Sequence, residues 1–561
     1  MNKPVKAKTL IQEIAEWSCA LKFDEIPGRV IEKAKLQTLS VLAAIHSSAR
    51  TRAGKILTDT AKEFYGPGKS TLLPSGEKAS LSAAALSWAG LSVAQDYDCY
   101  LLFGHTGHSA VSASLLTGEF SDADAKQMLC AQVIANEIEG RIGASVLLGP
   151  HNGQGWSFIH LIGAAASASR LLGLSPEKTS QALAISFYQP TYVLYPGFMG
   201  PDSKLLTSAT PTMIGMQAAF LAQKGFTGAL DILENHQGFF NHFAYYPLPM
   251  MVSGLGKTWV TDTLAYKIYP GCAYIDTAVD SMFAIIDRYK KDTGEDLDAD
   301  QIDQIGVEAT ALTVEMDNLS KVGISFDPLN PVSINFSIPG NIALALIHGK
   351  LSGAELREEN LEQDPDRIMK LAGKVRLAHN LEMTVEMMRK MNPALRIPEL
   401  FRELSLLKLY QAQRRINRQY GRRMGLEWQE LKKFLQKQGA TLFNDLERGV
   451  RMRLGNWLIR EPGEKWSWSL ADADLENFTM PFSAKVTVGL KNGKSLTHRQ
   501  DIPNGGPGQP LEERKKLVLE KFRREAGPAL GEKNAKKVSE KILDFENIRG
   551  AGKLLEELCE G

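Results

Sequence analysis

The sequence predicts a mainly helical protein with a smaller part in which helices and strands mix, and three observations lead to this fold class. Apolar residues recur at three-to-four spacing through the first half. Later, "DQIGVEATAL" has strand composition, and "PFSAKVTVGLKNGKSL" predicts a hairpin with its turn at Asn492-Gly493. Between these strands, residues 384–478 are rich in Arg, Lys, Gln and Leu, a composition that favours helices.

The helical segments follow one another along the first half of the chain. The apolar spacing predicts helices over residues 10–23, 26–49, 81–95, 124–148 and 158–174. Ala, Ser and Gly crowd the central segments, and small residues let helices approach closely, so we expect a buried bundle rather than a βαβ domain. A further helix begins with Ser175 as N-cap and Pro176 at the first helical position. The tail from Pro510 onward returns to an amphipathic helix.

Length and composition narrow the class of protein. A chain of 561 residues is too long for one ordinary core, which suggests two or three domains. With 44% hydrophobic residues, 23% charged residues and a formal net charge of +1, the chain is expected to be soluble and not to bind nucleic acid. Signal-peptide character, a membrane span and CxxC pairs are all missing from the sequence. We therefore expect a cytoplasmic protein without disulfides.

The stretch "DYDCYLLFGHTGHSA" brings together most of the polar chemistry of the first half. Asp96 and Asp98 would share one face of a strand but diverge on a helix, so they need not act together, and one could instead cap a helix. His105 and His108 could chelate a metal if their segment were helical, but the adjoining glycines indicate a loop and no metal-binding pattern occurs elsewhere. We therefore expect no metal, and a histidine that transfers protons near neutral pH.

Two further segments offer charged or nucleophilic groups. Lys204 precedes a helix rich in small residues, where its charge would add to the positive end of the helix and could hold a substrate carboxylate. A solvated surface lysine is the alternative. In "YKIYPGCAYIDTAVDSM", Lys267 precedes a Pro-Gly turn that would present Cys272 near a helix start. The Cys272 thiolate would be stabilised there, unless the side chain is simply a small buried apolar group.

These segments, in this order, resemble the MmgE/PrpD family, which includes 2-methylcitrate dehydratase, cis-aconitate decarboxylase and iminodisuccinate epimerase-like proteins. The resemblance rests on "DYDCYLLFGHTGHSAVSASLL", "GAAASASRLLGLSPEKTSQALAIS", "DSKLLTSATPTMIGMQAAFLAQKGFTGALDILENHQGFF", "KIYPGC" and "NFSIPGNIALALIHG". It covers most of the chain outside the Arg-rich segment 384–478.

The resemblance implies a particular domain plan. A large helical domain would be built from both chain ends, residues 1–265 and 508–561, and a smaller α+β lid from residues 266–507. The lid would carry a helical insertion over about 384–478, packed over the cleft mouth or a dimer surface. The family also implies a homodimer that needs no organic cofactor.

Carried over residue by residue, the resemblance also implies a site. The catalytic histidine falls on His105, with His108 as the competing choice, and the acidic pair falls on Asp96 and Asp98. Lys204 matches the substrate-binding lysine. The remaining matches are Tyr100, at a position where the family often has threonine, and Lys267 with Cys272, in the "K-x-x-P-x-[C/H]" turn.

The sequence departs from the family at two polar positions. Gln154 stands where a second active-site histidine is often found, flanked by His151 and His160, and Gly340 replaces a frequent tyrosine. In this assignment His105, Asp96, Lys204 and Tyr100 are catalytic. The residues expected to contact substrate are Asp98, His108, His151, Gln154, Lys267 and Cys272.

The resemblance implies a cofactor-independent lyase or isomerase. Such an enzyme would remove a proton next to a carboxylate of a small di- or tricarboxylic acid, as a dehydratase, decarboxylase or epimerase does. Two alternatives remain open: a catalytically altered family member that only binds a carboxylate metabolite, and a helical interaction protein that uses the Arg-rich segment.

Overall fold

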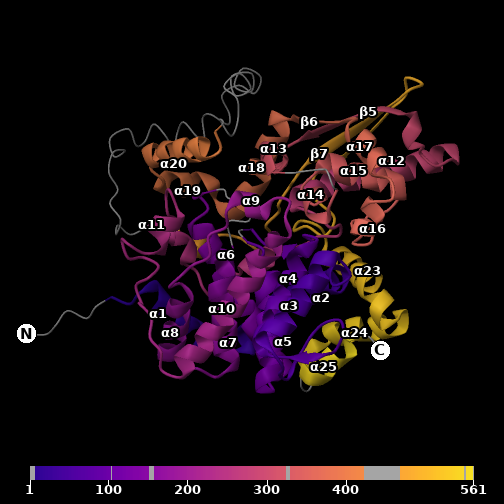
Figure 1. Cartoon of the computed structure of the whole chain (residues 1–561). Helices are drawn as coiled ribbons and strands as arrows, with labels where there is room; N and C mark the ends of the chain where they lie inside the picture. Colours follow the sequence, from indigo (N-terminus) through magenta and orange to yellow (C-terminus); the bar gives the residue numbers. More distant parts are fainter. Residues whose placement is uncertain are drawn as a thin grey trace, which may run out of the picture.

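The computed structural model describes residues 7–102, 104–150, 157–323, 329–421, 468–548 and 551–559. Within these residues the protein is mainly helical with a small mixed sheet, which confirms the predicted fold class at this level. Figure 1 shows the two parts, with most of the first half of the chain forming a helical body below the sheet and its helices. His151 and Gln154 lie outside the described residues.

The helical body is built from closely packed helices whose interfaces depend on small residues. Where α10 crosses α7, a Cβ on Gly215 would fall 2.2 Å from the carbonyl oxygen of Leu161, so only glycine allows this approach. Ser175 caps α8 with Pro176 at its first position, as predicted. The helices of the body are α1 Leu10–Ala20, α2 Gly28–Ser48, α3 Arg52–Tyr65, α4 Leu81–Ala94, α5 Gly107–Ser121, α6 Ala125–Ser145, α7 Ile159–Leu171, α8 Pro176–Ser186, α9 Tyr195–Phe198, α10 Leu206–Gln223 and α11 Phe239–Phe243.

The C-terminal helices pack against the helices that begin the chain. They are α23 Leu511–Leu530, α24 Glu532–Leu543 and α25 Ala551–Glu557. α23 lies along α2, and Val518 and Phe522 join Ile11 and Leu39 in one hydrophobic core. Figure 1 shows these yellow helices beside the indigo ones. The two ends of the chain therefore share a core.

A four-stranded mixed sheet forms the second part, in the order β6-β5-β7-β8. β5 Ile302–Ala309 runs parallel to β6 Val375–His379 and antiparallel to β7 Ala484–Leu490, which forms a hairpin with β8 Ser495–Gln500. Gly493 has φ 85° in the hairpin turn, as the Asn-Gly pair predicts. The sequence did not predict β6, whose five residues carry little strand signal.

Helices cover this sheet, and alternate residues of β7 are buried. α12 Asp276–Thr293 packs on β7 and β8 and contacts α15 Ile338–His348. The other helices of this part are α13 Ala311–Gly323, α14 Pro331–Ile334, α16 Glu358–Leu361 and α17 Pro365–Ala372. Two pairs of two-residue strands lie outside this sheet: β1 Ser70–Thr71 pairs with β2 Lys78–Ala79, and β3 Cys99–Tyr100 pairs with β4 Ala265–Tyr266.

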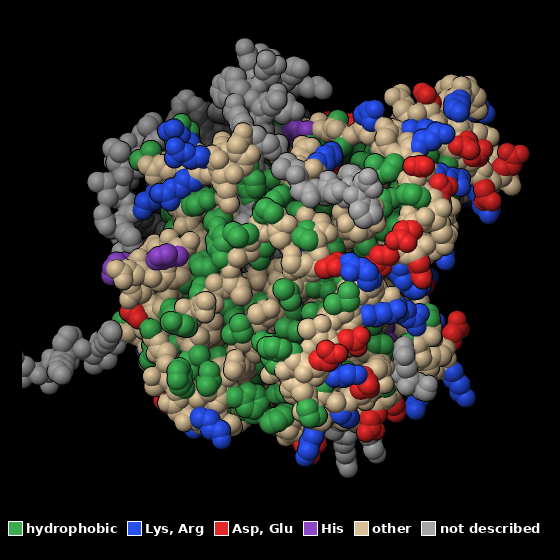
Figure 2. All heavy atoms as spheres, in the orientation of Figure 1, with side chains coloured by type: hydrophobic (Ala, Val, Ile, Leu, Met, Phe, Trp, Pro, Cys, Tyr) green, Lys and Arg blue, Asp and Glu red, His purple; other side chains and the backbone are tan. Residues whose placement is uncertain are grey.

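The Arg-rich segment is mainly helical up to Gln419, as its composition predicts. α18 Leu381–Leu395, α19 Ile397–Glu403 and α20 Leu406–Gln419 follow one another, and residues 422–467 lie outside the described residues. The hydroxyl of Tyr246 accepts from the amide of Ser405, and that of Tyr245 donates to Gln419, each at 2.9 Å. These bonds hold α20 against the helical body. Figure 2 shows basic side chains gathered over α20.

Among the helices of the described ranges, none combines the length and the apolar character that crossing a bilayer requires.

Candidate active site

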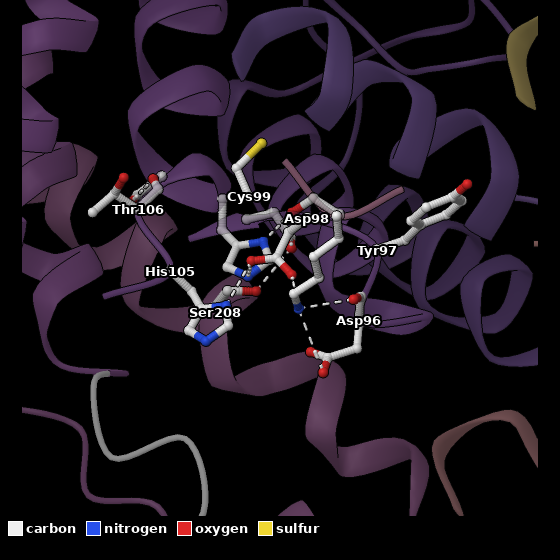
Figure 3. Close-up of polar contacts among 12 residues, drawn as sticks. Asp96, Tyr97, Asp98, Cys99, His105, Thr106 and Ser208 are labelled. Atoms are coloured by element: carbon white, nitrogen blue, oxygen red, sulfur yellow. Dashed lines mark hydrogen bonds and ion pairs between the residues drawn. The ribbon is translucent and has the colours of Figure 1, made fainter. Parts of the chain in front are cut away.

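Two short strands bring the acidic stretch 96–100 beside the segment 265–272. β3 pairs antiparallel with β4, so that Cys99 lies opposite Tyr266. Beyond the strands, the amide of Lys267 donates to the carbonyl of Asp98, and the amide of Gly271 donates to that of Asp96, each at 3.3 Å. Figure 3 shows Asp96 and Asp98 turned toward a shared centre while Tyr97 points away.

Asp98 is the centre of the polar cluster and is fully buried. Its Oδ1 accepts from Lys267 Nζ at 2.6 Å, and its Oδ2 lies 2.8 Å from His105 Nδ1 and 3.3 Å from His108 Nε2. Burial alone would raise the pKa of Asp98, but the charge of Lys267 holds that pKa well below its usual range. Asp98 is therefore an ionised carboxylate that only accepts hydrogen bonds.

Asp96 completes a second ion pair within the same cluster. Its Oδ1 lies 3.4 Å from Lys204 Nζ, and its Oδ2 lies 3.6 Å from Lys267 Nζ, which also donates to the Asp96 carbonyl at 2.9 Å. Burial raises the pKa of Asp96, but Lys204 and Lys267 outweigh this effect and lower it. The sequence did not require the two aspartates to act together, but both carboxylates contact Lys267 and so belong to one cluster, and neither residue caps one of the described helices.

Backbone conformation shapes this end of the cluster. Asp96 has φ 52°, in the left-handed region that Asp tolerates better than most residues. Gly271 has φ 131°, and a Cβ there would fall 2.4 Å from Ile275 Cδ1. The turn at Gly271 can therefore press against Asp96 only with glycine at this position.

Lys204 lies where the sequence placed it, at the entry to a helix. It belongs to the 3₁₀ turn Asp202–Leu205 that leads into α10, and its ammonium lies 4.5 Å from the ring centroid of Phe336. The side chain is fully buried, so the alternative of a solvated surface lysine is wrong. Burial lowers the pKa of Lys204, and Asp96 opposes this shift. Nζ has no hydrogen-bond partner among the described residues.

The two loop histidines differ in their surroundings. The side chain of His105 is 13% exposed, whereas that of His108 is completely buried. His108 Nδ1 lies 2.7 Å from the hydroxyl of Ser92, and burial lowers the pKa of His108 despite the nearby charge of Asp98. Gly107 and His108 already belong to α5, so the expected loop ends at Thr106. His105 is therefore the more accessible of the two histidines.

Tyr100 and Cys272 border the cluster as neutral groups. The Tyr100 ring centroid lies 6.1 Å from that of His105, and its buried hydroxyl has no hydrogen-bond partner among the described residues. Burial, with the nearby Asp276, raises the pKa of Tyr100 well above its usual range. Burial also raises the pKa of Cys272 to about 12. The stabilised-thiolate hypothesis for Cys272 is therefore wrong, and this side chain is a protonated thiol.

A second buried group of polar side chains lies next to His108, and the sequence did not predict it. The hydroxyl of Ser109 on α5 donates to Glu139 Oε1 on α6 at 2.6 Å and lies 2.7 Å from His160 Nδ1 on α7. The ring centroids of His160 and His108 are 5.4 Å apart. A Cβ at position 163 would lie 1.6 Å from Glu139 Oε1, so Gly163 makes room for this carboxyl.

Burial determines the charge of the Glu139 and His160 side chains. It raises the pKa of Glu139 well above its usual range, and it lowers the pKa of His160 well below its own. Both groups therefore favour their neutral forms. In the sequence, Glu139 and His160 lie in two separate predicted helices, which by itself does not predict contact.

Gly340 occupies a structural position in the first turn of α15. Its amide donates to the hydroxyl of the N-cap Ser337 at 3.0 Å, and a Cβ there would meet Ile334 Cδ1 at 3.0 Å. A side chain as large as tyrosine would require its neighbours to move. Gly340 therefore supports the start of α15 and supplies no phenol hydroxyl.

Asp98, His105 and His108 also have the ligand types that a metal prefers, and their ligand atoms lie within 4.8 Å of one another. Lys267, however, already pairs with Asp98, and a cation at this place would be repelled by the buried ammonium groups of Lys267 and Lys204. The absence of a metal remains a prediction. The carboxylates of Asp96 and Asp98 are thus matched by the ammonium groups of Lys204 and Lys267.

Comparison with known proteins places the chain in a family. Residues 12–249 match the MmgE/PrpD N-terminal domain, and residues 269–403 match the MmgE/PrpD C-terminal domain. The second match ends inside segment 384–478.

Curated relatives agree with these matches. The chain is 26% identical to a cis-aconitate decarboxylase of Aspergillus terreus over 299 residues, which cover 49% of this chain and 60% of that protein. It is also 26% identical to the cis-aconitate decarboxylase of Homo sapiens over 295 residues, covering 47% of this chain and 56% of that protein. The matched part thus spans little more than half the length of these relatives. Both domain matches and both relatives agree, and the chain belongs to the MmgE/PrpD family.

Proposed function

We propose that this protein is a lyase or isomerase that acts on a small di- or tricarboxylic acid by proton transfer next to a carboxylate, without an organic cofactor. The observation that carries the proposal is the buried ammonium of Lys204, which lacks a hydrogen-bond acceptor among the described residues. A buried ammonium without hydrogen bonds is costly. A substrate carboxylate would supply the missing acceptors, because an ammonium has three N–H donors.

The charges around Lys204 support a site for an anion. Lys267 donates to Asp98 and to the Asp96 carbonyl, whereas among the described residues Lys204 has the longer, 3.4 Å contact with Asp96 and the ring of Phe336. Lys204 is thus held less closely than Lys267, which pairs with both aspartates. In this proposal Lys204 binds the anion, and Lys267 holds the carboxylates of Asp96 and Asp98 in place.

His105 is assigned the proton-transfer step. Because the ionised carboxylate of Asp98 can only accept, His105 Nδ1 carries a proton, and in the neutral ring Nε2 holds the lone pair. Nε2 would take the proton from the carbon next to the carboxylate, and the C–H electron pair would move onto the carboxylate as an enolate. Lys204 would stabilise that charge, and the protonated Nε2 would return the proton or give it to a leaving hydroxide.

Decarboxylation is the finer possibility that the relatives suggest, since they are named cis-aconitate decarboxylase. There the C–CO2⁻ bond would break, and its electron pair would delocalise through the adjacent C=C bond into a remaining carboxylate. For this reaction His105 would start as the imidazolium, protonated on both nitrogens, and its Nε2–H would give the carbanion a proton and leave the neutral ring. The substrate would lose CO2 and gain one proton, so the same residues can serve this reaction. We also propose that the chain acts as a homodimer.

The test uses the purified full chain in D2O with a panel of carboxylic acids that includes cis-aconitate and citrate. Deuterium incorporation or conversion, followed by NMR and mass spectrometry, supports the enzyme if it is lost in His105→Ala and kept in His236→Ala, an exposed histidine. Binding without any exchange would overturn the proposal in favour of a metabolite-binding relative. Neither binding nor exchange would favour an interaction protein.

A further inference from the structure

A lysine of the C-terminal helix reaches the backbone on which the site is built. Lys521 on α23 is fully buried, and its Nζ donates to the carbonyl of Tyr97 at 2.6 Å, to the carbonyl of Lys267 at 3.0 Å and to the hydroxyl of Ser40 at 2.9 Å. Its ammonium also lies 3.9 Å from the ring centroid of Tyr97. Lys521 contacts none of the groups assigned to chemistry above.

The acceptors of Lys521 lie on both sides of the central ion pair. The Tyr97 carbonyl belongs to the peptide group that leads into Asp98, and the other carbonyl belongs to Lys267 itself, whose ammonium binds Asp98. Lys521 thus joins the backbone next to β3 to the backbone next to β4. Arg524, one turn further along α23, donates to the carbonyl of Ile268 at 3.0 Å and reinforces the same connection.

We propose that Lys521 is a positioning residue, which holds the Asp98–Lys267 pair in its working geometry by bridging the carbonyls of Tyr97 and Lys267. The assignment rests on the proposed function for its effect on activity. A displacement of about 1 Å in a catalytic group can lower the rate roughly a hundredfold. The hydrogen bonds from Lys521 to Tyr97, Lys267 and Ser40, called the brace below, can therefore affect turnover although Lys521 does not contact the substrate.

Only the protonated form of Lys521 satisfies all three acceptors. An ammonium has three N–H donors, whereas a neutral amine has two and must release one acceptor. Burial lowers the pKa of Lys521 to about 7, opposed by Cys99, Asp98 and Glu525. The other titratable or charged groups around it are Arg524, Tyr97 and Asp276. The brace is therefore complete below about pH 7 and incomplete above it.

Deprotonation of Lys521 has opposite effects on the free energy of unfolding and on the hydrogen bonds that Lys521 donates. Because the pKa of Lys521 is lower in the folded protein than in the unfolded chain, the unfolded chain binds more protons above about pH 7. The contribution of Lys521 to the free energy of unfolding therefore rises with pH in this range, while one hydrogen bond of the brace is lost. Activity should fall on the alkaline side without a matching loss of stability from this group.

The experiment compares the full chain with Lys521→Met, Lys521→Arg and the matched control Lys516→Met, an exposed lysine on the same helix. Lys521→Met should lower kcat about tenfold to a hundredfold with little change in KM, and its pH profile should lack the wild-type alkaline limb near pH 7. Lys521→Arg keeps its charge, so it should recover part of the activity at high pH. Lys516→Met should behave as wild type.

Hydrogen exchange separates this proposal from the proposed function. Protection of the backbone amides of residues 96–100 and 265–270 should fall in the wild type as the pH rises through about 7, after correction for intrinsic exchange, and should not change with pH in Lys521→Met. Equal pH dependence of protection in the wild type and Lys521→Met would overturn the brace, whether or not the chain is an enzyme. Absent turnover with this exchange pattern intact would overturn only the proposed function.

Discussion

Oδ2 of Asp98 lies 2.8 Å from Nδ1 of His105, and this contact fixes which nitrogen of the imidazole carries a proton. Since the pKa of Asp98 is held well below its usual range by Lys267 against the effect of burial, the carboxylate is ionised and Nδ1 must donate. The basic lone pair of neutral His105 then lies on Nε2. The same carboxylate also contacts His108, but that ring is completely buried.

His105→Ala should therefore lower kcat by roughly 10²–10⁴-fold, the usual contribution of a general acid or base. Binding of a carboxylic acid should change little, because Lys204 remains. Solvent deuterium exchange measures the first effect and calorimetry the second, with His236→Ala as the control. Turnover close to wild type in His105→Ala would move the role to His108 or to the undescribed His151.

Asp98→Asn should destabilise the protein by about 3–5 kcal/mol, because it leaves the buried ammonium of Lys267 without its closest anionic partner. The double variant Asp98→Asn/Lys267→Met should recover much of this loss. Chemical denaturation measures both effects.

The pH dependence of this pair has a definite sign. The depressed pKa of Asp98 contributes stability that is present above its unfolded value and is lost as the pH falls through the lower, folded value. Acid should therefore reduce the stability of the wild type more steeply than that of the double variant. Parallel curves for the two proteins would rule out a strong Asp98–Lys267 interaction.

Lys204→Met should weaken binding of a carboxylic acid by about tenfold or more, since one charged hydrogen bond is worth about 1.5–3 kcal/mol. The free energy of unfolding should fall less than in Asp98→Asn, because burial lowers the pKa of Lys204 and Asp96 keeps its contact with Lys267. Lys224→Met, an exposed lysine just after α10, is the control. Undiminished affinity in Lys204→Met would exclude this residue from anion binding.

The wild type should lose stability relative to Glu139→Gln as the pH rises. The raised pKa of Glu139 means that its contribution is complete below the unfolded value and decreases as the pH rises toward the folded value, since the unfolded carboxyl ionises first. Glutamine stays neutral and can still accept from Ser109. Thermal unfolding of both proteins at pH values from about 5 to 8 tests this prediction. A stability difference between Glu139→Gln and the wild type that does not change with pH would contradict it.

Activity should survive prolonged treatment with chelators, because Lys267 and Lys204 oppose a cation beside Asp98. Metal analysis of the purified protein, before and after chelation, provides the measurement. Stoichiometric zinc or iron that disappears together with activity would reverse this expectation and would assign Asp98, His105 and His108 as ligands.

The sequence by itself determined the features that depend on neighbours along the chain. Apolar spacing located α1, α2, α4, α6 and α7, Ser175 and Pro176 located the start of α8, and Asn492-Gly493 located the hairpin turn. Each of these signals arises within a few residues, because helix periodicity, capping and turn conformation are local properties. The family resemblance added the residues expected at the site.

Tertiary structure alone decided how those residues work. The sequence left open whether Asp96 and Asp98 act together, whether Lys204 lies at the surface or in a site, and whether Cys272 is a thiolate or a small buried apolar group. It gave no sign of β6 or of the contacts of Glu139. Each outcome depends on burial and on partners distant in the sequence: Lys267 across the β3–β4 pair, and Lys521 from the C-terminal helix. A charge has its pKa and its hydrogen bonds set by the groups that surround it in space, and only the packed fold brings those groups together.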